Sequence, residues 1–230
     1  MTTTGTYAYS PAISDLVVNA YGRLQIRRAA LTVDHLTDAA TEANLLLTEW
    51  ASKQPLLWKS ETQNLGTLVS GTATYTPAAR TVDILIAYIR TGSGTSQVDR
   101  VIGPLSTVEY QSMPTKTQTG VPTSFWFDRL ISPTIYLWPT PDTGGPYTLI
   151  IQTVIQVQDA AITAGVTPDM PYRFFDAFVA GLAHRLSRIW APSLEQARKM
   201  DAMEAWANAA GNDVESVPLY LIPGLNSYFQ

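Results

Sequence analysis

The sequence predicts an α+β fold: a four-helix core, an antiparallel β-rich unit inserted between its two helical pairs, and an extended C-terminal tail. Three observations lead to this prediction. Apolar residues recur at spacings of three and four near both ends of the chain, which is typical of helices with one buried face. Between these segments the period falls to two and β-branched residues become frequent, which is typical of strands. After Gly211 the apolar residues follow no helical period.

Two helices are expected in the first part of the chain. The first is predicted to start at Ser10 and Pro11, because Ser caps helices well and Pro is favoured at the first helical position. The second is predicted to start at Thr32 and to end before Pro55. The expected apolar faces are Ile13, Leu16, Val17, Ala20, Tyr21 and Leu24 in the first helix, and Leu36, Ala39, Ala40, Ala43, Leu46, Leu47 and Trp50 in the second.

Strands are expected in the middle of the chain. Leu68 to Thr76 is rich in β-branched residues and closes on a proline. Val82 to Arg90 has apolar residues on both alternations, so both faces of this strand are expected to be covered for much of its length. A hairpin is predicted from Ser124 to Trp138, with a turn near Ser132 and Pro133, and Thr148 to Gln156 is the last predicted strand.

The glycine-rich run at 92–96 is predicted to be a flexible hairpin tip that contacts a neighbour in an assembly. It lacks the Gly-Lys-Ser/Thr ending of a phosphate-binding loop.

Helical periodicity returns after Asp169. The third helix is predicted to end at Pro192, and the fourth to start with a capping box of Ser193 and Gln196 and to stop at Gly211. The expected apolar faces are Phe174, Phe175, Phe178, Val179, Leu182, Ala183, Leu186, Ile189 and Trp190 in the third helix, and Ala197, Met200, Met203, Ala207 and Ala210 in the fourth. These limits predict a helical domain from residues 1–55 and 159–211, a β-rich domain from 56–158 and a C-terminal arm from 212–230.

Composition argues against several functions. The net charge is −4 and the pI about 5.1, whereas tight sequence-independent DNA binding needs clustered Lys and Arg. The chain has no cysteine, so disulfides and thiol catalysis are absent. Its two histidines, His35 and His184, accompany no nucleophile motif or metal-ligand spacing, so neither a cofactor nor a metal is expected. No apolar run approaches the roughly 18 residues of a membrane span, and the first residues do not resemble a secretory signal, so we expect a cytoplasmic protein without membrane contact.

Four segments in order resemble one family of phage proteins. They are AYGRLQIRRAALTVDHLTDAATEANLLLTEW at 20–50, STVEYQSMPTKTQTGVPTSFWFDR at 106–129, YLWPTPD at 136–142 and TPDMPYRFFDAFVAGLAHRLS at 167–187. Together they resemble the tail adaptor, or head-to-tail connector, proteins of short-tailed phages, the family of the P22 tail accessory factor. The resemblance spans roughly residues 10–210.

The resemblance implies a structural role in the neck of a virion, assembled in the host cytoplasm, and no enzymatic activity. Relatives form a ring of about twelve copies that matches the symmetry of the portal. The implied partners are the portal protein, neighbouring copies of the chain, the next tail component (a nozzle or tail hub), and double-stranded DNA passing through the channel. In relatives, a C-terminal segment holds the portal.

The C-terminal segment is the strongest partner-binding candidate in the sequence itself. Free, disordered tails are usually polar, because their burial cannot offset the entropy of ordering. This one is mostly apolar and is broken by two prolines, which suits an extended peptide in a groove, although packing on its own subunit is the alternative. The predicted partner-binding residues are Val217, Pro218, Tyr220, Leu221, Ile222, Leu225, Tyr228 and Phe229.

A small basic group is the second candidate. Arg23, Arg27 and Arg28 lie close together in the sequence and are predicted to line the DNA channel or to contact an acidic neighbour; a solvated surface is the alternative.

Two other functions stay open from the sequence. One is a different virion role, as a tail-completion or stopper protein. The other is a cell-wall hydrolase carried in the virion, which needs two facing carboxylates, and Glu109 and Asp128 are the least implausible pair.

Overall fold

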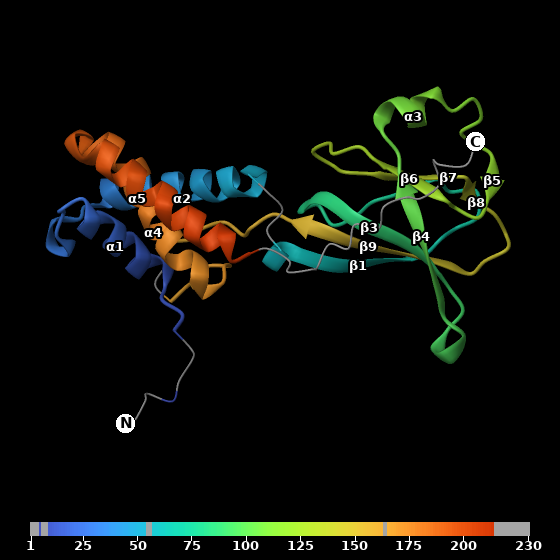
Figure 1. Cartoon of the computed structure of the whole chain (residues 1–230), viewed down its shortest axis with the longest axis horizontal. Helices are drawn as coiled ribbons and strands as arrows, with labels where there is room; N and C mark the ends of the chain where they lie inside the picture. The colour runs from blue at the N-terminus through green and yellow to red at the C-terminus, as the bar shows by residue number, and fades with distance from the viewer. Residues whose placement is uncertain (1–4, 6–8, 54–56, 163–164, 214–230) are drawn as a thin grey trace, which may run out of the picture.

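The computed structural model describes residue 5 and residues 9–53, 57–162 and 165–213. Within them the chain forms a helical part and a β part, which lie end to end in an elongated molecule (Figure 1). The predicted α+β class is therefore confirmed. Each part has its own cluster of buried apolar residues. The exact domain boundaries stay a prediction.

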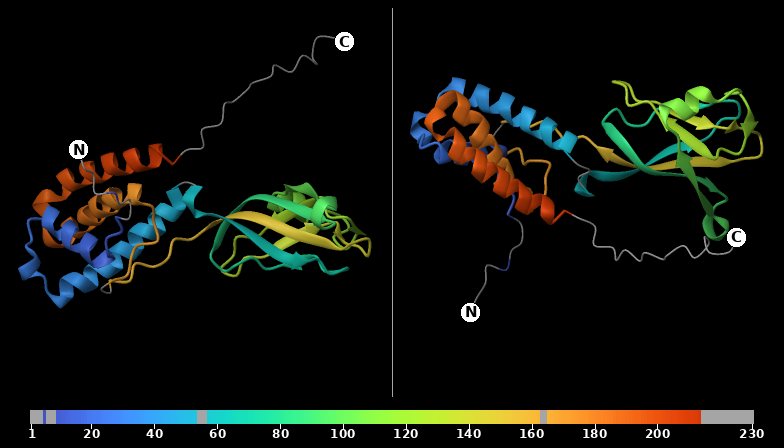
Figure 2. Two further views of the ribbon diagram at one scale, coloured as in Figure 1. Left: turned by 90° about the horizontal axis from the view of Figure 1, so that it is seen from below. Right: turned by 45° about the horizontal axis from the view of Figure 1, so that its top comes forward.

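The helical part combines segments from both ends of the described chain. It contains α1 (Ile13–Arg23), η1 (Arg28–Ala30), α2 (Val33–Lys53), η4 (Tyr172–Phe174), α4 (Phe175–Trp190), η5 (Pro192–Leu194) and α5 (Glu195–Gly211). The helix α4 packs against α1, α2 and α5 and is the centre of this part. Figure 2 shows α2 and α5 on opposite sides of it.

A glycine of α4 lies at its contact with α2. A Cβ atom at Gly181 would lie 3.0 Å from Cδ2 of Leu46 on α2, so the two helices approach closely at this point. Tyr21, Trp50, Phe174 and Phe178 are almost fully buried around the same helix. The apolar residues that the sequence places at spacings of three and four thus meet in one core.

The helix starts differ slightly from the prediction. The cap of α1 is Ala12, two residues after Ser10, and its side chain accepts no cap hydrogen bond. The predicted capping box of Ser193 is also wrong: α5 follows η5 directly, and its cap residue Leu194 makes no side-chain cap bond. A capping box is present instead at Ser106, before the short helix α3 (Thr107–Ser112) that the sequence did not reveal.

Three apolar faces need correction. On α4, Ile189 was predicted on the buried face but is 48% exposed. On α2, Leu36 is 41% exposed, and His35 takes the buried place, stacked on the ring of Trp190 at a centroid distance of 3.8 Å. On α5, Met200 and Met203 are each 64% exposed. The buried side of α5 instead carries Ala205, Trp206 and Ala209, which pack on the core. The amphipathic signal of this helix is weak, and its residues alone did not show which side would meet α4.

The β part is a curled seven-stranded sheet in the order β1-β9-β3-β4-β6-β7-β2, with a two-stranded sheet of β5 and β8 beside it. The strands are β1 (Ser60–Thr67), β2 (Thr74–Tyr75), β3 (Thr81–Thr91), β4 (Val98–Pro104), β5 (Thr119–Gly120), β6 (Ser124–Phe127), β7 (Ile135–Trp138), β8 (Thr140–Pro141) and β9 (Tyr147–Ile155). Curling brings Ile89, Ile102, Ile135, Leu149 and Ile151 into one core.

The strand predictions have mixed outcomes. The predicted hairpin is β6 and β7, the last predicted strand is β9, and the glycine-rich run joins β3 to β4. The antiparallel prediction holds for most pairs, but β4–β6 and β5–β8 are parallel. The predicted strand Leu68–Thr76 is wrong, because only Thr74 and Tyr75 pair. The strand β3 is covered on both faces only near its end, since Leu85 and Ile86 are exposed.

Specific contacts fix the junction between the two parts. Lys59 ends the short helix η2 (Leu57–Lys59) before β1, and its buried ammonium forms an ion pair with Asp169, which precedes α4. The Asp169 carboxylate also accepts a hydrogen bond of 3.2 Å from the backbone N–H of Gln158. The Asn44 side chain of α2 accepts one of 2.7 Å from the backbone N–H of Ala160. The segment that follows β9 is therefore bound to the helical part by two hydrogen bonds.

Candidate functional site

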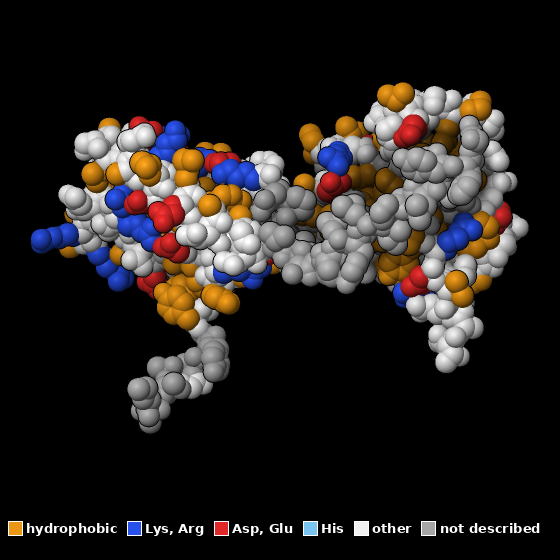
Figure 3. Space-filling model, viewed as in Figure 1, with side chains coloured by type: hydrophobic (Ala, Val, Ile, Leu, Met, Phe, Trp, Pro, Cys, Tyr) orange, Lys and Arg blue, Asp and Glu red, His pale blue; other side chains and the backbone are white. Residues whose placement is uncertain are grey.

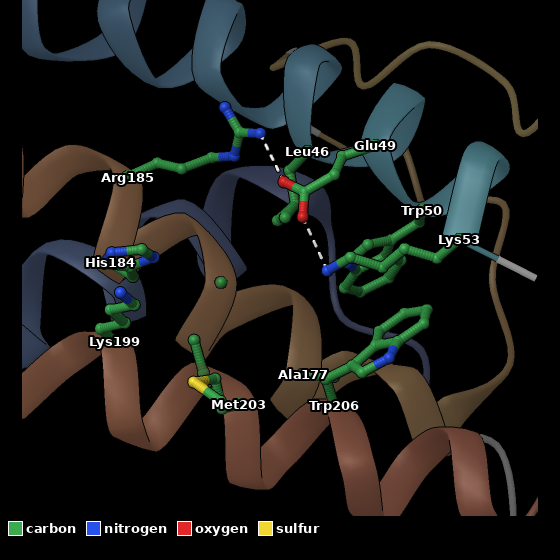
Figure 4. Close-up of a pocket in the computed structure, with 12 residues that line it drawn as sticks. Leu46, Glu49, Trp50, Lys53, Ala177, His184, Arg185, Lys199, Met203 and Trp206 are labelled. Carbon is green, nitrogen blue, oxygen red and sulfur yellow. Dashed lines mark hydrogen bonds and ion pairs between the residues drawn. The ribbon is translucent and has the colours of Figure 1, made fainter.

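A groove lies in the helical part between α2 and α5, with α4 at its base (Figure 4). Its volume is about 380 Å³. Leu46, Trp50, Ala177 and Gly181 form an apolar floor, and Trp206 closes one side. The ring of Trp206 lies 4.8 Å from that of Trp50, so two aromatic faces meet in the groove.

Charged residues line the rim of this groove. The Glu49 carboxylate accepts a hydrogen bond of 2.6 Å from Arg185 and lies 2.6 Å from Nζ of Lys53 (Figure 4). The bond from Lys53, together with that from Arg185, holds the pKa of Glu49 below its usual value. Arg185 also donates to Glu42 at 3.1 Å. The arginine thus joins two carboxylates that lie two helical turns apart on α2, a spacing that could have indicated this network from the sequence.

His184 is the titratable group at the base of the groove. Burial lowers the pKa of His184, and the adjacent Arg188, whose Nη2 lies 3.3 Å from the ring Nε2, lowers it further. The residues that line the groove include no Ser, Thr or Cys that this histidine could activate. The groove is therefore suited to hold an apolar group of a partner beneath a charged rim.

The three predicted arginines do not act as one group. Arg23 forms an ion pair with Asp176 of α4. Arg27 and Arg28 are exposed between α1 and α2, at the end of the helical part away from the sheet (Figure 1). Among the described residues, no ion pair involves either of them. Their contact with DNA or an acidic neighbour stays a prediction.

The two carboxylates of the hydrolase hypothesis have structural roles. Glu109 accepts a hydrogen bond of 2.7 Å from the backbone N–H of Ser106, and this bond is the main cause of its lowered pKa. Asp128 accepts one of 2.7 Å from the backbone N–H of Thr134, and so holds the turn between β6 and β7. A glycosidase acid needs a raised pKa, so the environment of Glu109 has the opposite effect.

The predicted partner-binding residues from Val217 to Phe229 lie outside the described residues. Their role stays a prediction.

Among the residues that the structure describes, no group of three or more His, Cys, Asp or Glu is placed to hold a metal ion. None of the helices described there has the length and apolar character needed to cross a bilayer.

Exposed apolar residues are the features that sequence reasoning missed. In the β part, Leu130 and Ile131 are 68% and 102% exposed at the turn between β6 and β7. Hydrophobic side chains also reach the surface of the helical part among charged ones (Figure 3). Contiguous apolar patches on a protein surface are typical of sites that contact other proteins.

Comparison with known proteins identifies the family. No curated protein matches the chain. A family model described as SU10 adaptor protein matches residues 12–219, which include the helical part, the β part and the first residues of the C-terminal segment. The chain therefore belongs to the SU10 adaptor protein family, a family of phage adaptor proteins, and is a component of the virion.

Proposed function

We propose that this chain forms a dodecameric ring beneath the portal of a tailed phage, extends the DNA channel and connects the head to the tail. The family match over residues 12–219 carries this proposal. An adaptor works by contact, and the described surface offers a groove with an aromatic wall and several exposed apolar residues. Repetition around a ring makes modest contacts hold firmly, because the ring leaves its partner only when the contacts of all its subunits break together.

The C-terminal segment is proposed to bind the portal. Residues 216–230 carry no Lys, Arg, Asp or Glu, and Val217, Tyr220, Leu221 and Ile222 begin a dense apolar run. An uncharged, proline-broken peptide can add its backbone to a groove and place alternate side chains in pockets. The helix α5 ends at Gly211, shortly before this segment, so the segment would leave the ring from the helical part.

The end of the helical part that carries Arg27 and Arg28 is proposed to face the channel. Two exposed guanidinium groups per subunit would form a thin basic ring in an otherwise acidic protein. Such a ring favours passing contact with phosphates and not tight binding, which suits DNA that must move. The sheet would then face the next tail component, a nozzle or tail hub.

We further propose that the protein acts without catalysis. The roles of Glu109 and Asp128 in a capping box and a turn support this view. Phage particles that carry Glu109→Gln and Asp128→Asn together should infect normally if these residues are structural. A loss of infectivity with intact particles would instead support the hydrolase alternative.

Electron microscopy of the purified protein, with and without portal rings, tests the main proposal. We expect a ring of about twelve subunits stacked coaxially on the portal. Removal of residues 217–230 should leave a folded protein that no longer joins the portal, whereas the control Asn226→Ala with Ser227→Ala should bind normally. Co-purification with the tail tube instead of the portal would favour the stopper or tail-completion role. Normal portal binding by the truncated protein would contradict the proposed role of the segment.

A further inference from the structure

The outer face of α2 carries no charge along most of its length. From Leu36 to Ser52, a stretch that the structure describes completely, the exposed residues are Leu36, Thr37, Thr41, Leu45, Thr48 and Ser52. Soluble surfaces are normally rich in Lys, Arg, Asp and Glu. An exposed helix face made only of Leu, Thr and Ser is therefore unusual, and we call these six residues the α2 face.

The hydroxyl groups on the α2 face are already satisfied within the helix. Thr37 donates to the carbonyl of Val33 at 3.0 Å, Thr41 to that of Thr37 at 3.2 Å, and Thr48 to that of Asn44 at 2.9 Å. Ser52 donates to the carbonyl of Glu49 at 2.8 Å. Burying a polar group costs free energy chiefly when it loses its partner. A second protein could therefore cover this face without leaving an unsatisfied donor.

The acidic residues within this stretch of α2 turn toward the bundle. Asp38 accepts a hydrogen bond of 3.1 Å from Nε1 of Trp190, while Glu42 and Glu49 both bind Arg185. These contacts draw the Asp38 and Glu42 carboxylates away from the outer face, and the charge of the 41% exposed Glu49 side chain is balanced by Arg185 and Lys53. A neutral face cannot attract DNA phosphates, which need basic groups. It suits another protein surface that also has few charges.

The helix α5 offers a largely apolar surface, in which Glu204 is exposed among the apolar residues and Lys199 is exposed at the edge. Met200 and Met203 are exposed at its middle, with the exposed Ala197 and Ala207 on either side, and hydrophobic side chains reach the surface over α5 in Figure 3. Methionine side chains are flexible and adapt to a partner's surface. These four residues form the α5 face. The helix α5 lies across α4 from α2 (Figure 2), and Met203 also lines the groove between α2 and α5.

We propose that the α2 face of one copy packs against the α5 face of the next copy around the ring. This inference rests on the proposed function, because it names the contact that would hold the ring together. A closed ring of identical subunits needs two different surfaces, one for each neighbour. The uncharged α2 face and the largely apolar α5 face are two different surfaces of one helical bundle, so they meet that requirement. Threonine methyl groups and small alanines also allow two helices to approach closely.

Disulfide cross-linking tests the contact directly, because the native chain has no cysteine that could react in the background. We would pair Met200→Cys with Thr37→Cys, Thr41→Cys or Thr48→Cys, which sample successive positions along α2. Portal-bound necks would be oxidised and analysed on a non-reducing gel. Adjacent thiols have a high effective concentration, so at least one pair should give a ladder of multimers, about tenfold above the control. The control joins Thr41→Cys to Val108→Cys, which is 78% exposed in the β part.

A charge substitution gives an independent test. Leu45→Glu places a carboxylate on the α2 face, where the residue is 49% exposed, and should prevent ring formation while the circular dichroism spectrum stays unchanged. The matched control Val69→Glu, at a position 62% exposed in the β part, should still form rings.

The outcomes separate the two proposals. Intact rings with Leu45→Glu and no ladder from any pair would overturn the helix contact and leave the adaptor function standing. Dimers from Thr41→Cys alone would also overturn it, because they would show α2 faces packed on each other. Absence of the chain from purified necks would overturn the proposed function itself.

Discussion

The two parts of this molecule are built from contacts of very different range. In the helical part, the buried residues of each helix recur within one turn, and aromatic side chains such as Trp50, Phe174 and Phe178 fill the space around α4. In the β part, Ser60 pairs with Val154 and Glu61 with Thr153, which are more than ninety residues away, and the core is mainly aliphatic. Local periodicity therefore predicts the first part well, whereas the second depends on pairing that no short segment contains.

The two parts depend on each other at their junction. Separate cores would allow separate unfolding, but the chain enters and leaves the sheet beside the ion pair of Lys59 and Asp169. Four measurements test how independent the two parts are in stability.

The largest effect is expected in the helical core. Phe178→Ala removes a fully buried ring from α4 and should lower the free energy of unfolding of the helical part by about 3–5 kcal/mol. Methyl NMR signals of Ile135 and Leu137 in the β core should persist while helical signals broaden. Simultaneous loss of both sets of signals would show that the two parts unfold as one unit. The control Ile189→Ala alters a half-exposed residue of the same helix and should have little effect.

A smaller effect is expected at the junction. Asp169→Asn leaves the buried Lys59 ammonium without its counter-charge and should cost about 2–3 kcal/mol, measured by urea denaturation. Adding Lys59→Met, which removes the charge but keeps much of the volume, should recover most of the loss. Equal stability of the single variant and the native chain would show that the ion pair does not hold the junction.

Loss of the capping box should be weaker still and confined to the β part. Ser106→Ala removes the hydroxyl that accepts a hydrogen bond from the backbone N–H of Glu109 at 3.2 Å, and should cost about 1 kcal/mol. Amide hydrogen exchange should accelerate in α3 and stay unchanged in α4. Faster exchange throughout the sheet would mean that α3 supports more than its own turn.

The smallest expected effect is the difference in how the stability of the two parts depends on pH. His184 has a folded pKa below its ordinary 6.5, so the unfolded chain takes up a proton first and the helical part should lose stability as the pH falls below 6.5. Glu109 has a folded pKa below 4.5, so its contribution is present above 4.5 and should be lost in the β part only at lower pH. Thermal melts across this range, with His184→Gln as the control, should show two steps. A first step that persists in His184→Gln would contradict the assignment.

Sequence reasoning succeeded where the determining contacts are local. The helices were predicted near their observed limits because Ile13, Leu16, Val17 and Ala20 repeat at the period of one buried face. The strand β9 was also clear, because its run of β-branched and apolar residues is buried on both faces. The segment Leu68–Thr76 is also rich in β-branched residues, but only two of its residues pair, since composition does not specify a partner strand.

The sites divide in the same way. The groove between α2 and α5 escaped prediction because its lining comes from residues as distant as Leu46 and Trp206. The exposure of Met200 and Met203 was missed for a related reason: a helix with a weak apolar pattern can turn either side inward, and contact with α4 decides which.

The residue pattern alone predicts the α+β class, the order of helices and strands, and an apolar C-terminal segment, because each depends on neighbours within a few residues. Which helix faces stay exposed to solvent depends on the tertiary structure. In the folded chain, Asp38, Glu42 and Glu49 bind residues of α4, while Leu45 and three threonines are exposed to solvent. This arrangement depends on the packing of α2 against a helix more than a hundred residues away, and so does the uncharged face proposed to meet the next copy.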